Sequence, residues 1–144
     1  MEPSTLLLDD RLLIEELLHG LHLNTGLATT ALWYFRACRA ATIGGTGQLS
    51  GPFAQLSDDL QARAIQSLLT LSDHIALPDP RAVVPVMADL AARHDRLNAL
   101  NLEAVATARV LDAEVRLSPA AGRGLLPAVL DVEGIRWETI SPTP

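Results

Sequence analysis

Residues 6–14 read LLLDDRLLI, and this stretch decides the fold. The short apolar run 5–8 is typical of a strand that is buried on both faces of a parallel sheet. Asp9 or Asp10 then caps a helix, because a carboxylate accepts hydrogen bonds from the unpaired N–H groups of a first helical turn. The helix carries apolar side chains at helical spacing, namely Leu13, Ile14, Leu17, Leu18 and Leu21. A strand that leads directly into a helix predicts the opening of an α/β fold.

The same alternation continues to the end of the chain. Further strands are predicted at residues 27–29, 74–77, 113–117 and 135–139. Helices are predicted from about Thr30 (burying Leu32, Phe35 and Cys38), from the cap Ser57 (burying Ile65, Leu68 and Leu69), and over residues 81–94, 98–111 and 120–130. Residues 44–52 hold four glycines and predict a loop. The pattern predicts a three-layer α/β/α sandwich around a central, mostly parallel sheet of four to five strands.

Length and composition indicate one domain without a membrane anchor. A chain of 144 residues predicts a single domain over residues 1–140, with a disordered tail at 141–144. No run of eighteen apolar residues predicts a membrane span, and the N-terminus does not resemble a signal peptide. The single cysteine, Cys38, cannot form an intramolecular disulfide, which favours a reducing compartment. We therefore expect a cytoplasmic protein.

The charged residues exclude some kinds of chemistry. All eleven cations are arginine, so mechanisms that need a lysine are excluded. The net charge of −6 does not favour nucleic acid as an electrostatic partner. Glu114 and Arg116 lie in a predicted strand that should be buried on both faces. Either one face of the sheet is partly open there, or these two side chains pair with helix residues.

Two segments resemble a known family. Residues 6–14 resemble the opening strand and helix of PIN domains, in which a buried strand ends in a metal-binding aspartate. Residues 97–118, LNALNLEAVATARVLDAEVRLS, resemble the late helix and strand of the same family. The order of the elements between them also fits, so the resemblance covers nearly the whole chain. It implies a PIN-like fold.

The resemblance also implies a chemistry. PIN domains are typically Mg²⁺- or Mn²⁺-dependent ribonucleases, and many are toxins of bacterial toxin–antitoxin pairs. Three or four carboxylates at the carboxyl ends of their strands hold a divalent cation, which activates a water molecule. The four positions fall, in order, on Asp9 with Asp10 beside it, on residues 33–36, on Asn101, and on Ser118 or Pro119.

Only the first of these four positions carries an acid. The second is missing because the chain has no aspartate or glutamate between Leu17 and Ser57. Glu103 lies two residues after Asn101 and therefore faces another side of the helix. A site with one carboxylate would bind a divalent cation weakly, so the metal ligand is Asp9 alone or none.

Arg36 and Arg39 lie where the second acid is expected. Our hypothesis is that a guanidinium takes the place of the cation and pairs with Asp9 or Asp10; two solvated arginines are the alternative. The vestigial pocket predicted in this way consists of Asp9, Arg36, Asn101 and Ser118. Helix capping is the competing role for the two aspartates, and a place near the amino end of a helix is the competing role for Asn101. Ser118-Pro119 is a typical cap sequence.

These observations predict a PIN-like protein that has lost most of its metal-binding carboxylates. We expect a non-catalytic binding or assembly module of a bacterial cytoplasm, with a protein partner or a second copy (a homodimer) and no cofactor. The alternative is an active or weak Mg²⁺- or Mn²⁺-dependent ribonuclease of the toxin type, with Asp9 and Asp10 catalytic and RNA as substrate. That alternative needs further acids beside Asp9, drawn from Asp58, Asp59, Asp95 or Asp112. A small-molecule binder at the strand ends is a third possibility.

Overall fold

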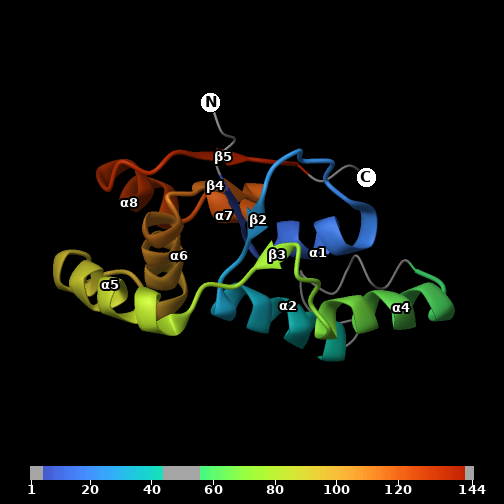
Figure 1. The fold of residues 1–144 in the computed structure, drawn as a ribbon. Coiled ribbons are helices and arrows are strands. Elements are labelled where there is room, and N and C mark those ends of the chain that lie inside the picture. Colours follow the sequence, from blue (N-terminus) through green and yellow to red (C-terminus); the bar gives the residue numbers. More distant parts are fainter. Residues whose placement is uncertain (1–4, 44–55, 142–144) are drawn as a thin grey trace.

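A computed structural model describes residues 5–43 and 56–141, which form a parallel sheet between two layers of helices (Figure 1). The sheet has five strands in the order β3-β2-β1-β4-β5. Every pair of neighbouring strands is parallel. The predicted three-layer α/β/α class is therefore confirmed.

The five strands are short and follow the predicted positions closely. They are β1 (Leu6–Leu8), β2 (Leu27–Ala28), β3 (Ile75–Ala76), β4 (Glu114–Leu117) and β5 (Trp137–Thr139). The helices that connect them are α1 (Asp10–His19), α2 (Ala31–Ile43), α4 (Asp58–Leu69), α5 (Pro80–Arg93), α6 (Ala99–Leu111), α7 (Pro119–Gly122) and α8 (Leu126–Val132). β1 lies in the middle of the sheet, as its three fully apolar residues require.

Capping side chains mark where five of the described helices begin. In each case the side chain of the residue before the helix accepts a hydrogen bond from a backbone N–H of the first turn. These residues are Asp9 before α1, Thr30 before α2, Ser57 before α4, Asp79 before α5 and Asn98 before α6. The predicted caps at Asp9 and Ser57 are thus confirmed.

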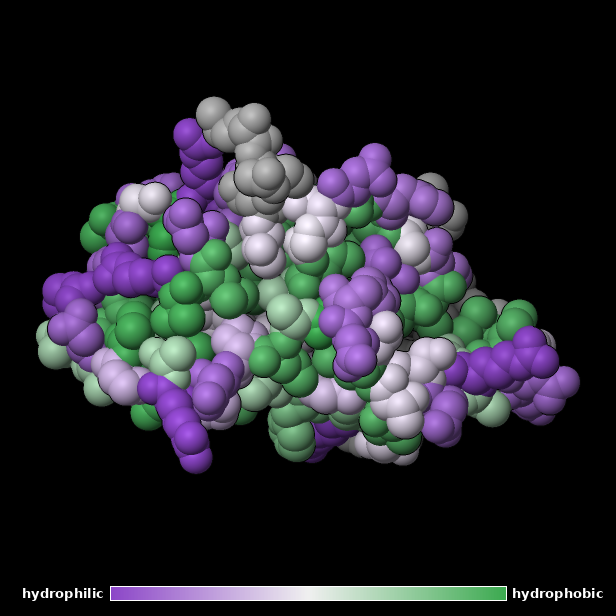
Figure 2. Space-filling model, in the orientation of Figure 1, coloured by the Kyte–Doolittle hydropathy of each residue, from purple (hydrophilic) through white to green (hydrophobic). Residues whose placement is uncertain are grey.

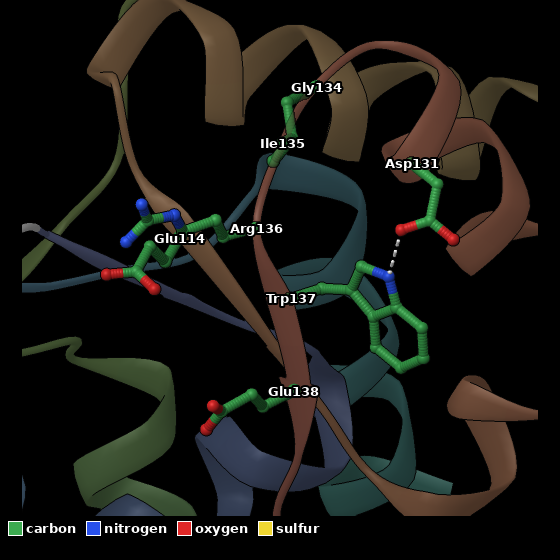
Figure 3. Close-up of a pocket in the computed structure, with 7 residues that line it drawn as sticks. All are labelled: Glu114, Asp131, Gly134, Ile135, Arg136, Trp137 and Glu138. Carbon is green, nitrogen blue, oxygen red and sulfur yellow. Dashed lines mark hydrogen bonds between the residues drawn. The ribbon is translucent and has the colours of Figure 1, made fainter.

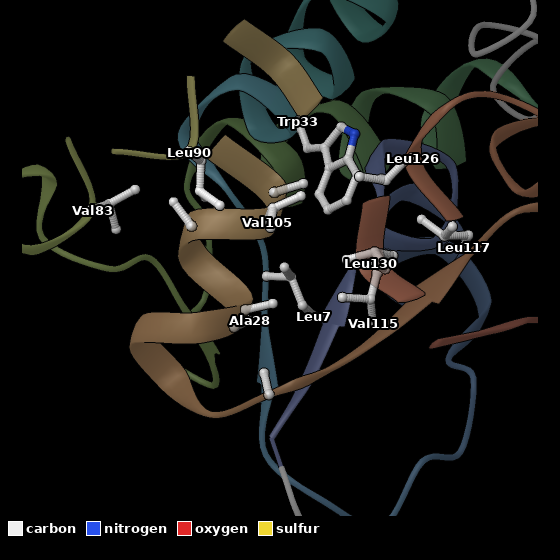
Figure 4. Close-up of a cluster of buried hydrophobic side chains, with 14 of the residues drawn as sticks. Leu7, Ala28, Trp33, Val83, Leu90, Val105, Val115, Leu117, Leu126 and Leu130 are labelled. Atoms are coloured by element: carbon white, nitrogen blue, oxygen red, sulfur yellow. The ribbon is translucent and has the colours of Figure 1, made fainter. Parts of the chain in front are cut away.

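Each face of the sheet supports its own hydrophobic core. On one face, Leu7, Ala28 and Val115 pack with α6 and α8, and Figure 4 shows them near Val105 and Leu130. On the other face, Leu6 and Leu8 pack with side chains of α1, α2 and α4. β1 contributes to both cores because successive side chains of a strand point to opposite faces.

The predicted buried face of α2 was wrong. Phe35 is 58% exposed and Cys38 is only half-buried, whereas the buried residues of α2 are Trp33, Ala37, Ala40 and Ala41. The alanines lie in the core shared with α1 and α4, where small side chains let the helices approach closely. Trp33 lies in the opposite core (Figure 4), so α2 contributes to both.

Other differences concern helix ends and surfaces. The single helix predicted over residues 120–130 is two helices, α7 and α8, which turn residues around Gly124 separate. Leu69 on α4 is exposed, although it was predicted to be buried, and Ala64 is buried in the same core as Leu68. The predicted loop over 44–52 and residues 142–144 of the predicted tail lie outside the described residues.

The charges in β4 are explained by an open sheet face. Glu114 and Arg116 alternate with the buried Val115 and Leu117. The Arg116 guanidinium lies 3.7 Å from a carboxylate oxygen of Glu114 and 3.9 Å from one of Glu138, whose side chain is 74% exposed. The first of the two predicted alternatives is therefore correct. Within the described ranges, no helix is long and apolar enough to cross a membrane.

Candidate functional site

Three buried polar residues follow three neighbouring strands at one edge of the sheet. Asp9 comes directly after β1, Thr29 directly after β2, and Ser118 directly after β4. The strands are parallel and adjacent, so their carboxyl ends meet at the same edge. This edge is the place where the sequence predicted a site.

The Asp9 carboxylate is completely buried and is held by three hydrogen bonds from the protein. Its Oδ1 accepts the backbone N–H of Leu12 at 2.9 Å. Its Oδ2 accepts the backbone N–H of Ser118 at 2.8 Å and the Ser118 hydroxyl at 2.7 Å. Asp9 is therefore both the cap of α1 and the link between β1 and β4.

Ser118 has a role that the cap sequence did not predict. It occupies the position before α7, and Pro119 is the first helical residue, as predicted. Its hydroxyl, however, makes no capping hydrogen bond to α7 and donates to Asp9 instead. The hydroxyl lies where the resemblance would place an acid, and it satisfies the carboxylate at the end of β1.

The neighbouring Asp10 pairs with an arginine. Its Oδ2 lies 3.0 Å from Nε of Arg36, on the first half of α2, and its Oδ1 accepts the backbone N–H of Arg11 at 2.8 Å. Asp10 is nearly buried, whereas half of the Arg36 side chain is exposed. The predicted pairing of an arginine with one of the two aspartates is thus present, and the partner is Asp10.

Both carboxyl groups are perturbed by their surroundings. Burial raises the pKa of Asp9, and the hydrogen bonds from Leu12 and Ser118 act against that rise. Burial also raises the pKa of Asp10, to about 6, with a further contribution from the charge of Asp9 and an opposing one from Arg36. Of these two adjacent buried acids, Asp10 is the one that pairs with the guanidinium of Arg36.

A third carboxylate lies nearby but is directed to a helix end. Glu103, on α6, accepts the backbone N–H of Leu32 at 2.8 Å. The Thr30 hydroxyl accepts the N–H of Trp33 at 3.0 Å in the same first turn of α2. A carboxylate is favourable there because the amino end of a helix carries partial positive charge.

The sequence did not assign roles to Glu103, Thr29 or Thr30. The Thr29 hydroxyl donates to the backbone carbonyl of Leu8 at 2.9 Å and so joins β2 to β1. A signal for the two threonines was available, because they directly follow a predicted strand and precede a predicted helix. For Glu103 no local signal exists, since its partner is 71 positions away in the chain.

Asn101 makes its described hydrogen bond at a helix start. Asn101 lies in the first turn of α6, where its backbone N–H donates to the cap Asn98. No hydrogen bond or ion pair joins its side chain to Asp9, Arg36 or Ser118 within the part of the chain that the structure describes. Asn101 is thus a residue of a helix start, which was its competing role.

The four acids that a nuclease site would need also lie elsewhere. Asp58 and Asp59 are exposed in the first turn of α4, and Asp95 is exposed after α5. Asp112 ends α6 and precedes β4, so it lies at the amino end of the strands, opposite to Asp9. The groups that bind the Asp9 carboxylate are N–H groups and a hydroxyl rather than other carboxylates.

This arrangement does not suit a Mg²⁺ or Mn²⁺ ion. Such ions need several free oxygen ligands in octahedral geometry. Both oxygens of Asp9 accept hydrogen bonds from the protein, and Asp10 faces a guanidinium. Across residues 5–43 and 56–141, no three histidine, cysteine, aspartate or glutamate side chains are placed to hold a metal ion together.

Comparison with known proteins places the fold but not a family. No family model matches the sequence, and no curated protein matches it. Among solved structures, a chain of VapBC-1 from nontypeable Haemophilus influenzae is similar, with a TM-score of 0.56 and 12% sequence identity. The similarity covers 94% of this chain and 98% of that chain. At this identity it shows that the two chains share a fold over nearly their whole length.

Proposed function

We propose that this chain is a PIN-like domain whose acidic site serves structure instead of catalysis, and that the protein acts as a non-catalytic binding module. The observation that carries the proposal is the set of hydrogen bonds around Asp9. The one acid that the PIN resemblance retains accepts Leu12 N–H, Ser118 N–H and the Ser118 hydroxyl. These three bonds occupy most of the acceptor sites of the carboxylate, which leaves a catalytic cation at most one lone pair on Oδ1.

The Arg36–Asp10 pair supports the same proposal. A buried pair of acids needs a positive charge, which a divalent cation supplies in a metal-dependent site. Here the guanidinium of Arg36, at 3.0 Å from Asp10, supplies it permanently. Arg36 thus stands where the resemblance would place a metal-binding acid. Its positive charge also balances the Asp10 carboxylate, so a metal ion is not needed for that purpose.

We infer that the binding partner is a protein, either a second copy of this chain or another polypeptide. PIN-like toxins work in pairs with protein antitoxins, and the fold is shared with a chain of VapBC-1. Large apolar side chains are exposed on α2 and α4, namely Phe35, Leu60 and Leu69. Figure 2 shows hydrophobic surface interrupted by hydrophilic residues on the side of the molecule that is in view. Such a mixed surface is typical of protein interfaces that form and dissociate.

Calorimetric titration with Mn²⁺ tests the loss of the metal site and needs no assumption about a substrate. We expect no saturable heat up to about 1 mM Mn²⁺, because such a site lacks ligands. The Asp9→Asn variant serves as the control and should behave like the unmodified chain. Cleavage of a mixed RNA substrate, measured in the same buffer with Mn²⁺, should remain at the level of a blank without protein.

The opposite result would identify the alternative function. Saturable binding at micromolar Mn²⁺ that Asp9→Asn abolishes would show that the acidic site is open, and the ribonuclease interpretation with Asp9 and Asp10 as catalytic residues would replace ours. Sedimentation of the chain alone, over a range of concentrations, then distinguishes a homodimer from a monomer that awaits a different partner.

A further inference from the structure

The free edge of β5 has the features of a peptide-binding strand. β5 is the last strand of the sheet, and among the residues that the structure describes it pairs only with β4. We propose that an extended polypeptide segment with basic side chains adds to this edge as a sixth strand. The inference rests on the β4–β5 edge alone and is independent of the acidic site and of its proposed loss of function.

The backbone groups of alternate β5 residues point away from the sheet. Val115 N–H donates to the carbonyl of Arg136, and Ile140 N–H donates to the carbonyl of Leu117, each at 2.9 Å. In a parallel pair the groups of even-numbered residues therefore face β4, and those of Trp137 and Thr139 face outward. Within the described residues, no hydrogen bond satisfies these outward groups. An added strand would satisfy them.

A hollow of about 420 Å³ lies against the start of β5. In Figure 3, Trp137 and Asp131 lie on one side of the strand, and Glu114 and Arg136 lie on the other. The indole N–H of Trp137 donates to Asp131 at 2.9 Å, which fixes the ring. An extended segment on the edge would place its alternate side chains in this hollow and against the indole.

The charges of the hollow determine which segment fits. Three of its side chains are carboxylates, namely Glu114, Asp131 and Glu138, against one guanidinium of Arg136. The nearby Arg116 lies 3.7 and 3.9 Å from Glu114 and Glu138, which is too far for hydrogen bonds. The carboxylates therefore keep free acceptors for a lysine or arginine of a partner, and the Trp137 ring favours a cation as well.

The same charges argue against other occupants. A nucleic-acid backbone would bring phosphates to three carboxylates, which repel it. A second copy of this chain would bring its own Glu138 toward the same edge, so like charges would meet. A basic extended segment of a different protein is the occupant that both the backbone and the side chains favour.

Titration of the full ¹⁵N-labelled chain with capped peptides tests this proposal. The probe is acetyl-VRVRV-amide, and its matched control is acetyl-VEVEV-amide. We expect the arginine peptide to shift the amide signals of Trp137 and Thr139 and the Trp137 indole signal, with a Kd on the order of 100 μM. The glutamate peptide should bind at least about tenfold more weakly.

Two variants separate the backbone and charge contributions. Thr139→Pro removes an outward N–H and should weaken binding about tenfold, whereas Thr139→Val keeps that N–H and should bind normally. Glu138→Gln should weaken only the binding of the arginine peptide. If Thr139→Pro does not fold, a probe methylated at its backbone nitrogens makes the same test on the peptide side.

Several results would overturn the proposal. If neither peptide shifts the amide signals at about 1 mM, the edge does not bind peptides with the expected Kd. Equal binding of the two peptides would refute the preference for basic side chains. A dimer of the chain that Thr139→Pro dissociates would show that a second copy occupies the edge instead.

Discussion

At the carboxyl end of β1, one buried carboxylate organises three segments of the chain. Asp9 caps α1 through Leu12, and it joins β1 to the residue that follows β4 through Ser118. A buried acceptor that loses a partner costs free energy, because water cannot replace the bond. The stability of the fold should therefore depend on the Ser118 hydroxyl, even though that hydroxyl takes part in no proposed reaction.

Ser118→Ala tests this dependence directly. The change removes the 2.7 Å hydrogen bond to Asp9 and keeps the backbone N–H that also donates to it. We expect the free energy of unfolding to fall by about 2 kcal/mol, since a bond to a buried carboxylate is stronger than a neutral one. Urea unfolding followed by circular dichroism measures the change.

The matched control for that change is Ser67→Ala, an exposed serine on α4. It should alter the free energy of unfolding by no more than about 0.5 kcal/mol. Equal effects of the two substitutions would mean that the hydroxyl bond contributes nothing beyond helix propensity.

Single residues were predictable from the sequence where their interaction is local or where the topology brings strand ends together. The cap at Asp9 and the pairing of Arg36 with one of the aspartates were both predicted, and both are present. Asn101 was placed in the pocket by resemblance alone; it lies in the first turn of α6, where its backbone N–H donates to Asn98. The role of Glu103 depends on how α6 packs against α2, which no local pattern shows.

At the scale of elements, the carboxylate of one residue joins the ends of three helices, α5, α6 and α8. Glu133, at the end of α8, lies 2.7 Å from Nε2 of His94 and 3.1 Å from Arg93, and it also bonds Arg109. These three partners come from the end of α5 and from α6. The hydrogen bonds lower the pKa of Glu133 to about 2, with that from His94 the largest cause.

This lowered pKa predicts a specific acid sensitivity. The unfolded carboxyl has a pKa of 4.5, so Glu133 stabilises the fold above that pH, and the contribution is lost as the pH falls toward about 2. Glu133→Gln removes the charge. We expect the loss of stability in this variant to be large near neutral pH and to disappear at about pH 2. Urea midpoints at several pH values measure it.

Glu138→Gln is the control for that series, because the Glu138 side chain is 74% exposed. It should change the urea midpoint little at any pH, as exposed pairs contribute little. A Glu133→Gln effect that stays the same across the acid range would show that Glu133 acts through packing and not through its charge.

The elements themselves were predictable from periodicity, and their buried faces were less so. All five strands appear within two residues of the predicted positions. In α2, however, the large apolar Phe35 was predicted to be buried and is exposed, while alanines are buried. Periodicity cannot decide whether a helix buries its face of large apolar side chains or its face of small ones. That choice depends on how closely the neighbouring helices approach.

For the whole molecule, our proposal separates the fold from the metal chemistry of PIN domains. The sheet order, the parallel strands and the two cores are all present. Arg36 and Ser118 lie where the resemblance would place acids, and they contact Asp10 and Asp9. The hydrophobic cores lie on the two faces of the sheet, whereas Asp9, Thr29 and Ser118 follow the strands at its carboxyl edge. The polar side chains at that edge are therefore not part of either hydrophobic core.

This separation predicts that the site can be rebuilt by two substitutions. Arg36→Glu and Ser118→Asp together would place two more carboxylates beside Asp10 and Asp9, where the present partners lie 3.0 and 2.7 Å away. Four crowded acids should lower the thermal stability in the absence of metal. Saturating Mn²⁺ should then raise the Tm of this double variant by about 5 °C or more, because an ion that binds only the folded state stabilises it.

The double variant Arg39→Glu with Ser67→Asp makes the same charge changes at exposed positions and serves as the control. Neither this control nor the unmodified chain should gain stability from Mn²⁺. A folded Arg36→Glu, Ser118→Asp variant that ignores Mn²⁺ would mean that the strand ends of this chain no longer have the geometry of a metal site. A gain in the unmodified chain would instead mean that Arg36 moves aside and that the site was never closed. The Mn²⁺-dependent shift in Tm thus separates a site that has lost its ligands from one that has lost its shape.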